Sequence, residues 1–178
     1  MKQGTTGRVT RHMQSPPEKL YDLVSDVRRM GEWSPECWHC EWLDGATGPA
    51  VGARFKGTNK HALVRWSTTV MILTADEGRA FAFVTSHRGH DETKWRYDFE
   101  PDHGGTTVTE SFEMMADLPW YLRLVERVLM RVKDRKSDLE SNMSETLTRL
   151  KAAVEGAVAL GAAEDGVLQV DVRDALDE

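Results

Sequence analysis

The strongest constraint on the fold is a long apolar stripe near the C-terminal end, which follows a run of short strands. Past Asp134, apolar residues recur at spacings of three and four, the pattern of one helix face, at Leu139, Met143, Leu147, Leu150, Val154 and Ala157. The strands before it follow one another through short turns, and this favours antiparallel pairing because parallel strands need long crossovers. A sheet with one apolar face must be covered, and only this helix is long enough to cover it.

The N-terminal part predicts one strand followed by two short helical segments. The strand covers residues 8–14, and Ser15 is expected to cap the helix after it, with Glu18 completing a capping box. Apolar residues at helical spacing carry that helical region to about Arg29, and Gly31 and the Ser34-Pro35 pair end it.

The middle of the chain predicts six further strands, over residues 37–43, 53–60, 63–74, 80–86, 93–100 and 106–114. The clearest is 93–100, where Trp95, Tyr97 and Phe99 alternate with polar residues, so the aromatic side chains share one face. Residues 118–132 are apolar enough for a helix, and we expect a break near 133–137 before the long helix begins. The pattern therefore predicts an α+β domain with a sheet of about seven strands.

Charge and hydropathy exclude several classes of protein. Residues 161–178 hold six acids and one base, so this segment carries most of the net charge of −6 and leaves the remainder near neutral. A near-neutral domain argues against nucleic-acid binding, which needs a basic face. No apolar run is long enough for a membrane span, and the N-terminus has no secretory pattern, so we expect a cytoplasmic protein without stable membrane insertion. The domain is assigned to 1–160, and the acidic tail 161–178 is compatible with disorder or with a short docking strand.

Several stretches together resemble the helix-grip superfamily of START-like and birch-pollen-allergen-like proteins (SRPBCC), closest to its bacterial polyketide cyclase/dehydratase and lipid-transport-like branch. The resemblance covers about residues 7–158 and rests on segments 15–21, 32–37, 52–57, 65–68, 95–101, 105–110 and 147–151. It implies a curved antiparallel sheet wrapped around the C-terminal helix, with an apolar cavity between them for a small hydrophobic ligand. It implies no cofactor and no metal. These motifs are specific for the fold and weak for function, because one fold hosts many activities.

The residues expected to line that cavity lie on the inward parities of the strands and on the helix. They are Trp66, Thr68, Val70, Phe81, Phe83, Trp95, Tyr97, Phe99, Val108, Phe112, Trp120 and Met143. Ligand pockets are mostly apolar and aromatic with a few polar groups, which this set matches. The alternative is ordinary core packing, and both hold if one end of the domain is closed and the other is open.

Glu110 is the candidate catalytic residue. It shares its strand parity with Val108 and Phe112, which belong in the core, so the carboxyl group is carried inward with them. A buried carboxyl group has a raised pKa and can bind a polar ligand group or act as a general acid or base. The alternatives are a bulge that turns Glu110 outward, or an ion pair with a base such as Arg96.

The Cys37-x-x-Cys40 pair suggests a metal or redox site, but the sequence context argues against both. A redox pair of this kind sits at a helix N-terminus, whereas these residues fall in a predicted strand, where they are expected to point to opposite faces. A zinc site needs four ligands, and the chain has no other cysteine.

Two polar segments have a functional and a plain interpretation. The run His87-Arg88-Gly89-His90-Asp91 is expected to be a solvated loop, which could also ligate a metal or border the cavity mouth. Basic residues recur every four positions at Arg123, Arg127 and Arg131, which predicts either a solvated helix face or an amphipathic contact with a membrane or partner.

Three functions remain open at this level. A binding or carrier protein for a lipid, a polyketide or a similar metabolite is favoured. A cyclase/dehydratase-type enzyme that uses Glu110 is the second, with Tyr97 or Arg96 assisting if it points inward. A protein-interaction module acting through the acidic tail or the arginine face is the third.

Overall fold

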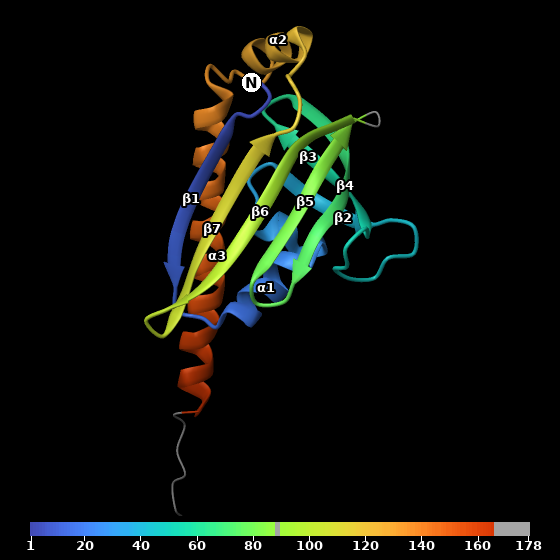
Figure 1. Ribbon diagram of the computed structural model, residues 1–178. Coiled ribbons are helices and arrows are strands. Elements are labelled where there is room, and N and C mark those ends of the chain that lie inside the picture. The colour runs from blue at the N-terminus through green and yellow to red at the C-terminus, as the bar shows by residue number, and fades with distance from the viewer. Residues whose placement is uncertain (88–89, 166–178) are drawn as a thin grey trace, which may run out of the picture.

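The computed structural model describes residues 1–87 and 90–165. It shows one seven-stranded antiparallel sheet with the order β1-β7-β6-β5-β4-β3-β2, and a long C-terminal helix, α3, lies along the inner side of this sheet (Figure 1). The predicted α+β class and helix-grip architecture are confirmed. The expectations for the segments 88–89 and 166–178 lie outside the described residues.

The elements follow the predicted order with shifts at their ends. The predicted loop over residues 87–91 is wrong for His87, which ends a strand, and for His90 and Asp91, which begin the next one. The strands are β1 (Thr6–Met13), β2 (Cys37–Trp42), β3 (Arg54–His61), β4 (Val64–Asp76), β5 (Ala80–His87), β6 (His90–Asp102) and β7 (Gly105–Met114). The helices are α1 (Pro17–Ser25), the 3-10 helix η1 (Val27–Glu32), α2 (Trp120–Val128) and α3 (Arg135–Asp165). Helix α3 therefore continues past residue 160, where the sequence placed the end of the domain.

The β6–β7 hairpin fixes the register of the two strands that carry the site. Its turn residues His103 and Gly104 have φ angles of 44° and 81°, which suit the two-residue turns that match strand twist. From this turn the pairing runs through Phe99 opposite Val108 to Tyr97 opposite Glu110. Neighbours across the strands therefore share the face that looks at α3.

The predicted capping box is wrong. Helix α1 starts at Pro17 with Pro16 as its N-cap and no side-chain cap bond, so Ser15 stands one position too early to reach the first free amides. The Ser15 hydroxyl is buried without a hydrogen-bond partner among the described residues. Its carbonyl accepts a 2.7 Å hydrogen bond from the Thr106 hydroxyl, which ties the start of α1 to β7.

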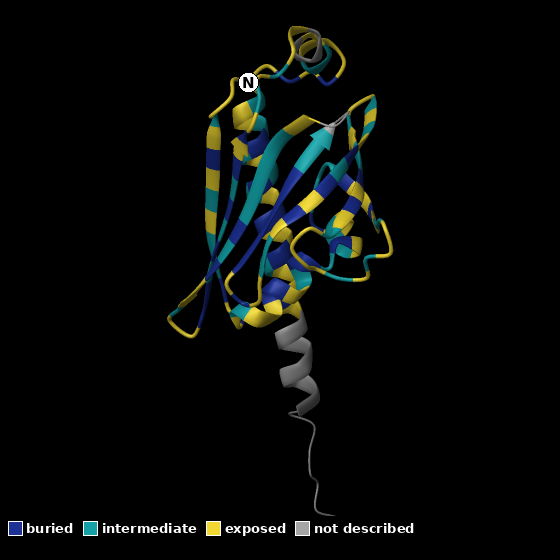
Figure 2. Ribbon diagram, turned by 45° about the vertical axis from the view of Figure 1, so that its right-hand side comes forward, coloured by how far each residue is buried: buried dark blue, intermediate teal, exposed yellow. Residues whose placement is uncertain are grey.

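The apolar core divides into two unequal clusters. The larger one fills the α1 end, where Leu147, Leu150 and Val154 of α3 pack with the inner strand residues and with α1 (Figure 2). The smaller one joins Phe112, Met114, Leu139 and Met143 near the start of α3. Polar residues and open space lie between the two clusters, and the candidate site is found there.

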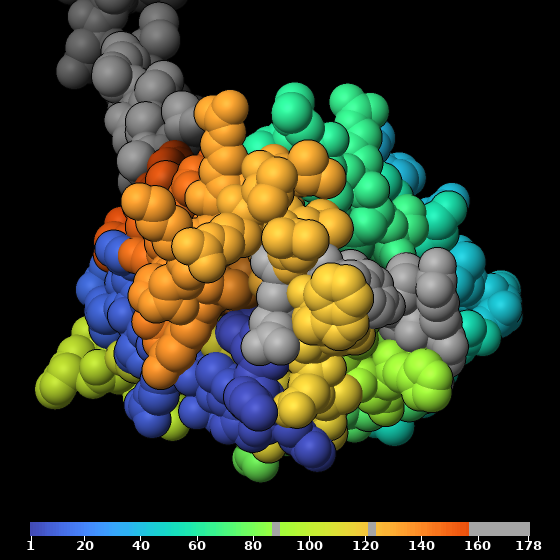
Figure 3. Space-filling view, turned by 90° about the horizontal axis from the view of Figure 1, so that it is seen from above, coloured from blue at the N-terminus to red at the C-terminus, as the bar shows by residue number. Residues whose placement is uncertain are grey.

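Helix α2 stands apart from α3, as the predicted break requires. The chain turns at Arg131, whose φ is 59°, and α3 then begins behind Asp134. The Asp134 carboxylate accepts hydrogen bonds from the Lys136 amide (3.0 Å) and the Ser137 hydroxyl (2.7 Å), which caps the new helix. Seen from above, α2 and its flanking residues cover this end of the molecule beside the N-terminal residues (Figure 3). Among the described helices, none has the length and apolar character needed to span a bilayer.

Candidate functional site

An internal cavity lies between the sheet and the first turns of α3. Its inner chamber has a volume of about 110 Å³. Apolar side chains make up much of the wall, among them Phe55, Val70, Phe83, Trp95, Leu139 and Met143. Polar groups are interspersed, chiefly Asn59, Thr68, Thr85, Glu110, Asn142 and Thr146.

A second chamber of about 250 Å³ adjoins the first beneath α2. The two chambers share the lining residues Glu36, Asn59, Thr68, Thr85, Trp95 and Leu139. Leu118, Val125 and Met130 contribute the α2 side of the outer chamber, and Met1 and Trp66 are also in its wall. Together the chambers fall within the roughly 300–1,000 Å³ of sites that bind small organic molecules.

Glu110 is buried at the inner chamber with only 4% of its surface exposed. Its Oε1 accepts a 2.7 Å hydrogen bond from the Tyr97 hydroxyl, and its Oε2 has no partner among the described residues. Burial raises the pKa of Glu110 to about 8, because the hydrogen bond from Tyr97 opposes the desolvation only in part. Arg96 pairs with Asp98 instead, so neither alternative considered for Glu110 applies.

The protonation state gives this carboxyl group a defined chemistry. Glu110 is neutral when the pH is below its pKa of about 8. Because Tyr97 donates its hydrogen bond to Oε1, the acid proton of the neutral form is assigned to Oε2. An O–H donor without a partner among the described residues then lies in the wall of the inner chamber, with less than 1 Å² of Oε2 exposed. Burial and the neighbouring Glu110 also raise the pKa of Tyr97 well above its ordinary value, so this phenol keeps its proton as a donor.

The predicted lining residues separate into three groups. Thr68, Val70, Phe83, Trp95, Tyr97 and Met143 lie at the inner chamber, and Trp66 lies at the outer one. The second group packs in the core: Phe81, Phe99 and Val108 lie in the larger cluster, and Phe112 contacts Trp95 with ring centroids 5.7 Å apart. Trp120 is 71% exposed and lines neither chamber, because it begins α2 on the outward side.

Several lining residues were missed by the sequence reasoning. Phe55 on β3 could have been found from the alternation of its strand. Asn142 and Thr146 stand beside the apolar stripe of α3, four residues apart, so one turn of the helix brings both to the chamber. Polar residues at the border of the apolar stripe of α3 are the sequence signal that could have predicted a cavity beside this part of the helix.

The expectation that Cys37 and Cys40 point to opposite faces is wrong. Cys37 pairs with Asn59 while His39 pairs with Thr58, so a β-bulge at Trp38 inserts one extra residue into β2. The extra residue restores a common face for the two cysteines, which are 9% and 2% exposed with their Sγ atoms 3.4 Å apart. Cys37 lines the inner chamber.

A buried ion network connects α3, α2 and the segment before β2. The Arg135 guanidinium lies 2.6 Å from Glu36 Oε1, 2.5 Å from Asp138 Oδ2 and 3.4 Å from Glu126 Oε1. Its side chain is 12% exposed. Burial opposes the charge on Arg135, but the carboxylates outweigh it and raise the pKa of the guanidinium further. The network holds Glu126 of α2 over the outer chamber.

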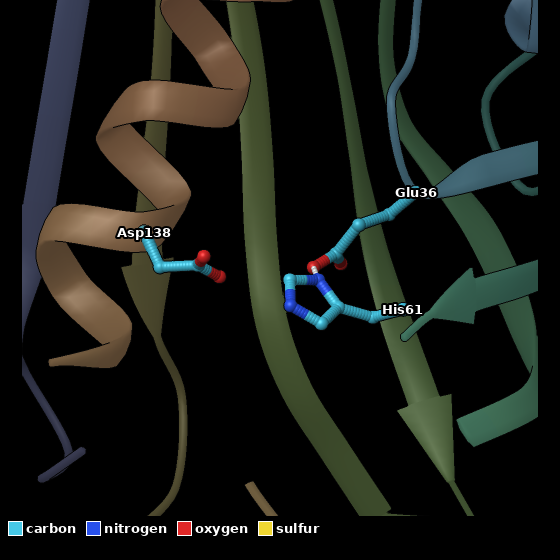
Figure 4. A group of neighbouring side chains, drawn as sticks. All are labelled: Glu36, His61 and Asp138. Carbon is cyan, nitrogen blue, oxygen red and sulfur yellow. Dashed lines mark hydrogen bonds and ion pairs between the residues drawn. The ribbon is translucent and has the colours of Figure 1, made fainter. Parts of the chain in front are cut away.

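Glu36, His61 and Asp138 were tested as a metal site because their ligand atoms lie within 4.8 Å of one another. Figure 4 shows Glu36 and His61 facing each other, with a 2.9 Å contact between His61 Nδ1 and Glu36 Oε1, and Asp138 directed at them from α3. Arg135 bridges Glu36 and Asp138 and supplies their positive countercharge. The cluster is therefore explained as an ion-pair network.

None of the remaining sequence candidates whose side chains the structure describes lines either chamber. Asp91 accepts a 2.6 Å hydrogen bond from the Ser86 hydroxyl across the β5–β6 pair, and His90 is exposed. Arg127 on α2 and Arg131 just after it are both exposed, which is the arrangement expected of a solvated helix face. A wider groove of about 410 Å³ along β1, β6 and β7 is lined largely by charged residues, which suits water better than an apolar guest.

The sheet order and the long C-terminal helix define a helix-grip protein, with the two chambers between its sheet and its helices. The sequence matches the model of the family described as polyketide cyclase / dehydrase and lipid transport over residues 5–155, so the chain belongs to this family. No curated protein matches the sequence.

Two solved structures under 25% identical have the same fold. Protein CV1439 from Chromobacterium violaceum is 18% identical, with 84% of this chain and 97% of that chain covered and a TM-score of 0.62. Protein DR_A0006 from Deinococcus radiodurans is 16% identical, with coverages of 86% and 99% and a TM-score of 0.62. The polyketide-cyclase-like protein Cgl2372 from Corynebacterium glutamicum is 30% identical, with coverages of 100% and 99% and a TM-score of 0.47.

Proposed function

We propose that this protein binds a small, largely apolar molecule whose one polar group is an uncharged hydrogen-bond acceptor, such as a ketone oxygen. The observation that carries the proposal is Glu110, a buried carboxyl group at the inner chamber with an unpartnered Oε2. A buried polar group without a partner is unfavourable, and a guest that supplies one gains from the pairing. The protonated acid donates, so the guest must accept.

From the sizes of the two chambers we infer which part of such a guest each chamber would hold. The inner chamber, about 110 Å³, is smaller than the roughly 150 Å³ cavity that holds a benzene molecule. It therefore has room for the carbonyl end and the atoms next to it. The outer chamber, about 250 Å³, takes the apolar body beneath α2.

Filling the inner chamber should abolish binding of a neutral aromatic ketone. Prodan, a fluorescent naphthyl ketone, serves as the probe, and Met143→Trp as the blocking variant because Met143 is 1% exposed and lines the chamber. We expect at least a roughly tenfold loss of affinity in a fluorescence titration, since overpacking excludes the guest. Met71→Trp, at a 38% exposed position on β4, is the matched control and should bind normally.

The same titration tests the role of Glu110. Affinity of the unmodified protein should fall as the pH rises through about 8, because the ionised carboxylate repels a ketone oxygen. Glu110→Gln keeps an N–H donor and should lose this pH dependence. Equal prodan binding by the Met143→Trp and Met71→Trp variants would show that the cavity is not the binding site.

A second candidate function is a dehydratase-type enzyme, and the raised pKa of Glu110 is the observation that favours it. A group with a pKa of about 8 exchanges its proton readily near neutral pH, as a general acid must. The protein should then catalyse loss of water from an aromatic β-hydroxy ketone, measured through the absorbance of the enone product. This activity should disappear in Glu110→Gln. An equal rate with Glu110→Gln, or with no protein present, leaves ligand binding as the function.

A further inference from the structure

The two cysteines of β2 form a thiol pair in the wall of the cavity. The bulge at Trp38 brings Cys37 Sγ to 3.4 Å from Cys40 Sγ. Both thiols are free. A disulfide bond is about 2.05 Å long, so the sulfur atoms would have to approach by about 1.4 Å to form one.

Gly57 leaves space for that approach. It pairs with Cys40 across β2 and β3, and a Cβ atom placed on it would lie 3.5 Å from Cys37 Sγ and 3.9 Å from Cys40 Sγ. Even a methyl group there would make only ordinary van der Waals contacts with the two sulfur atoms, so the backbone of β3 does not crowd them. The bulge and the glycine therefore arrange the two thiols side by side with room to move.

The two thiols differ in reactivity and in access. The hydrogen bond from Cys40 lowers the pKa of Cys37 despite its burial, and the same bond raises the pKa of Cys40. Cys37 is thus the better nucleophile, since the thiolate is the reactive form. Cys37 lines the inner chamber, whereas Cys40 does not. A small reagent inside the cavity meets Cys37 first.

We propose that Cys37 is a site of oxidation by hydroperoxides that enter the cavity, and that Cys40 resolves the product into a disulfide. In the first step the Cys37 thiolate attacks the hydroperoxide, the O–O bond breaks, an alcohol leaves and Cys37 becomes a sulfenic acid. In the second step the Cys40 sulfur attacks the Cys37 sulfur, and the S–O bond breaks. The departing oxygen takes up a proton and leaves as water. Two thiols are oxidised by two electrons and one hydroperoxide is reduced.

The direct test treats the reduced protein with one equivalent of cumene hydroperoxide, an apolar hydroperoxide. We expect the mass to fall by two hydrogen atoms, both thiols to become unreactive after denaturation, and dithiothreitol to reverse both changes. The chain has two cysteines, so the product can only be Cys37–Cys40 or an intermolecular dimer, which a non-reducing gel separates.

Two single variants assign the roles. In Cys40→Ser the sulfenic acid on Cys37 should persist and be labelled by dimedone. In Cys37→Ser the labelling of Cys40 should be at least about tenfold slower, because Cys40 is 2% exposed and does not line the inner chamber. Trp38→Phe keeps the bulge residue and should react as the unmodified protein does.

Equal labelling of both variants, or thiols that survive in the folded protein while the urea-unfolded chain reacts, would overturn the proposal. The assay uses no ligand and no chamber-blocking variant. It can therefore fail while prodan binding succeeds, and the reverse also holds.

Discussion

Replacing Glu110 with Gln should make the protein more stable than the unmodified chain at alkaline pH, by an amount that grows with pH. Burial raises the pKa of Glu110 to about 8 from its ordinary 4.5, so the fold favours the protonated form. The unmodified protein then loses about 1.4 kcal/mol of stability per pH unit between these two pKa values. Gln does not ionise, and the difference reaches on the order of 5 kcal/mol above pH 8.

The groups around Glu110 should not cause the difference in stability between the two proteins over this pH range, so the difference reports on the carboxyl group itself. On β6 its partner Tyr97 has a pKa raised well above 10 and stays protonated. Cys37 on β2 and Glu36 just before it also line the inner chamber, and both are present in both proteins. The α3 residues of the chamber, Leu139, Asn142, Met143 and Thr146, carry no charge.

The measurement is the free energy of unfolding in urea at intervals from pH 5 to pH 9. Glu113→Gln is the matched control, since Glu113 is exposed three residues further along the same strand. Its difference from the unmodified protein should stay small throughout. Parallel curves for Glu110→Gln and the unmodified protein would contradict a raised pKa at Glu110.

Replacing Arg135 with Ala should destabilise the protein by about 3–5 kcal/mol at neutral pH. The change leaves Glu36, Asp138 and Glu126 without their cation, and these side chains are only 15%, 23% and 16% exposed. Uncompensated carboxylates at such positions are unfavourable because water solvates them poorly. The loss should shrink as the pH falls, because burial raises the pKa of Glu126, which becomes neutral and then no longer needs the cation.

Arg149→Ala provides the control for Arg135 on the same helix. Arg149 pairs with Glu145 at the surface, with side chains 44% and 47% exposed, and such pairs contribute about 0.5 kcal/mol or less. Urea unfolding at pH 7 and pH 4 compares the two variants. A loss for Arg135→Ala as small as that for Arg149→Ala would show that the network is solvated rather than buried.

The fold was predictable because it depends on periodicity. Alternation in β6 and the three-and-four spacing of α3 each fix which face is apolar, and antiparallel pairing follows from the short turns. Glu110 could be identified for the same reason, since it lies between Val108 and Phe112 in the strand and shares their inward-facing parity. Where a strand stays regular, the sequence alone indicates which side chains point inward.

Features that depend on a departure from regular geometry could not be predicted. The bulge at Trp38 moves Cys37 onto the same face of the strand as Cys40. The residue types near it do not predict a bulge. Trp120 was expected at the cavity entrance because it lies where the helical region meets the sheet, but α2 turns this side chain outward, to 71% exposure. The division between packed core and open chamber depends on how side chains from distant elements meet, which a single sequence does not encode locally.

The bulge in β2 also bears on how relatives of this chain should be compared. A family member without the extra residue would keep a regular strand, and the residue aligned with Cys37 would then face solvent whatever its identity. A one-residue gap at this position is therefore more informative than a substitution, because it decides whether any side chain from this end of β2 lines the inner chamber. Alignments that close such a gap for the sake of matching cysteines would equate positions on opposite surfaces of the sheet.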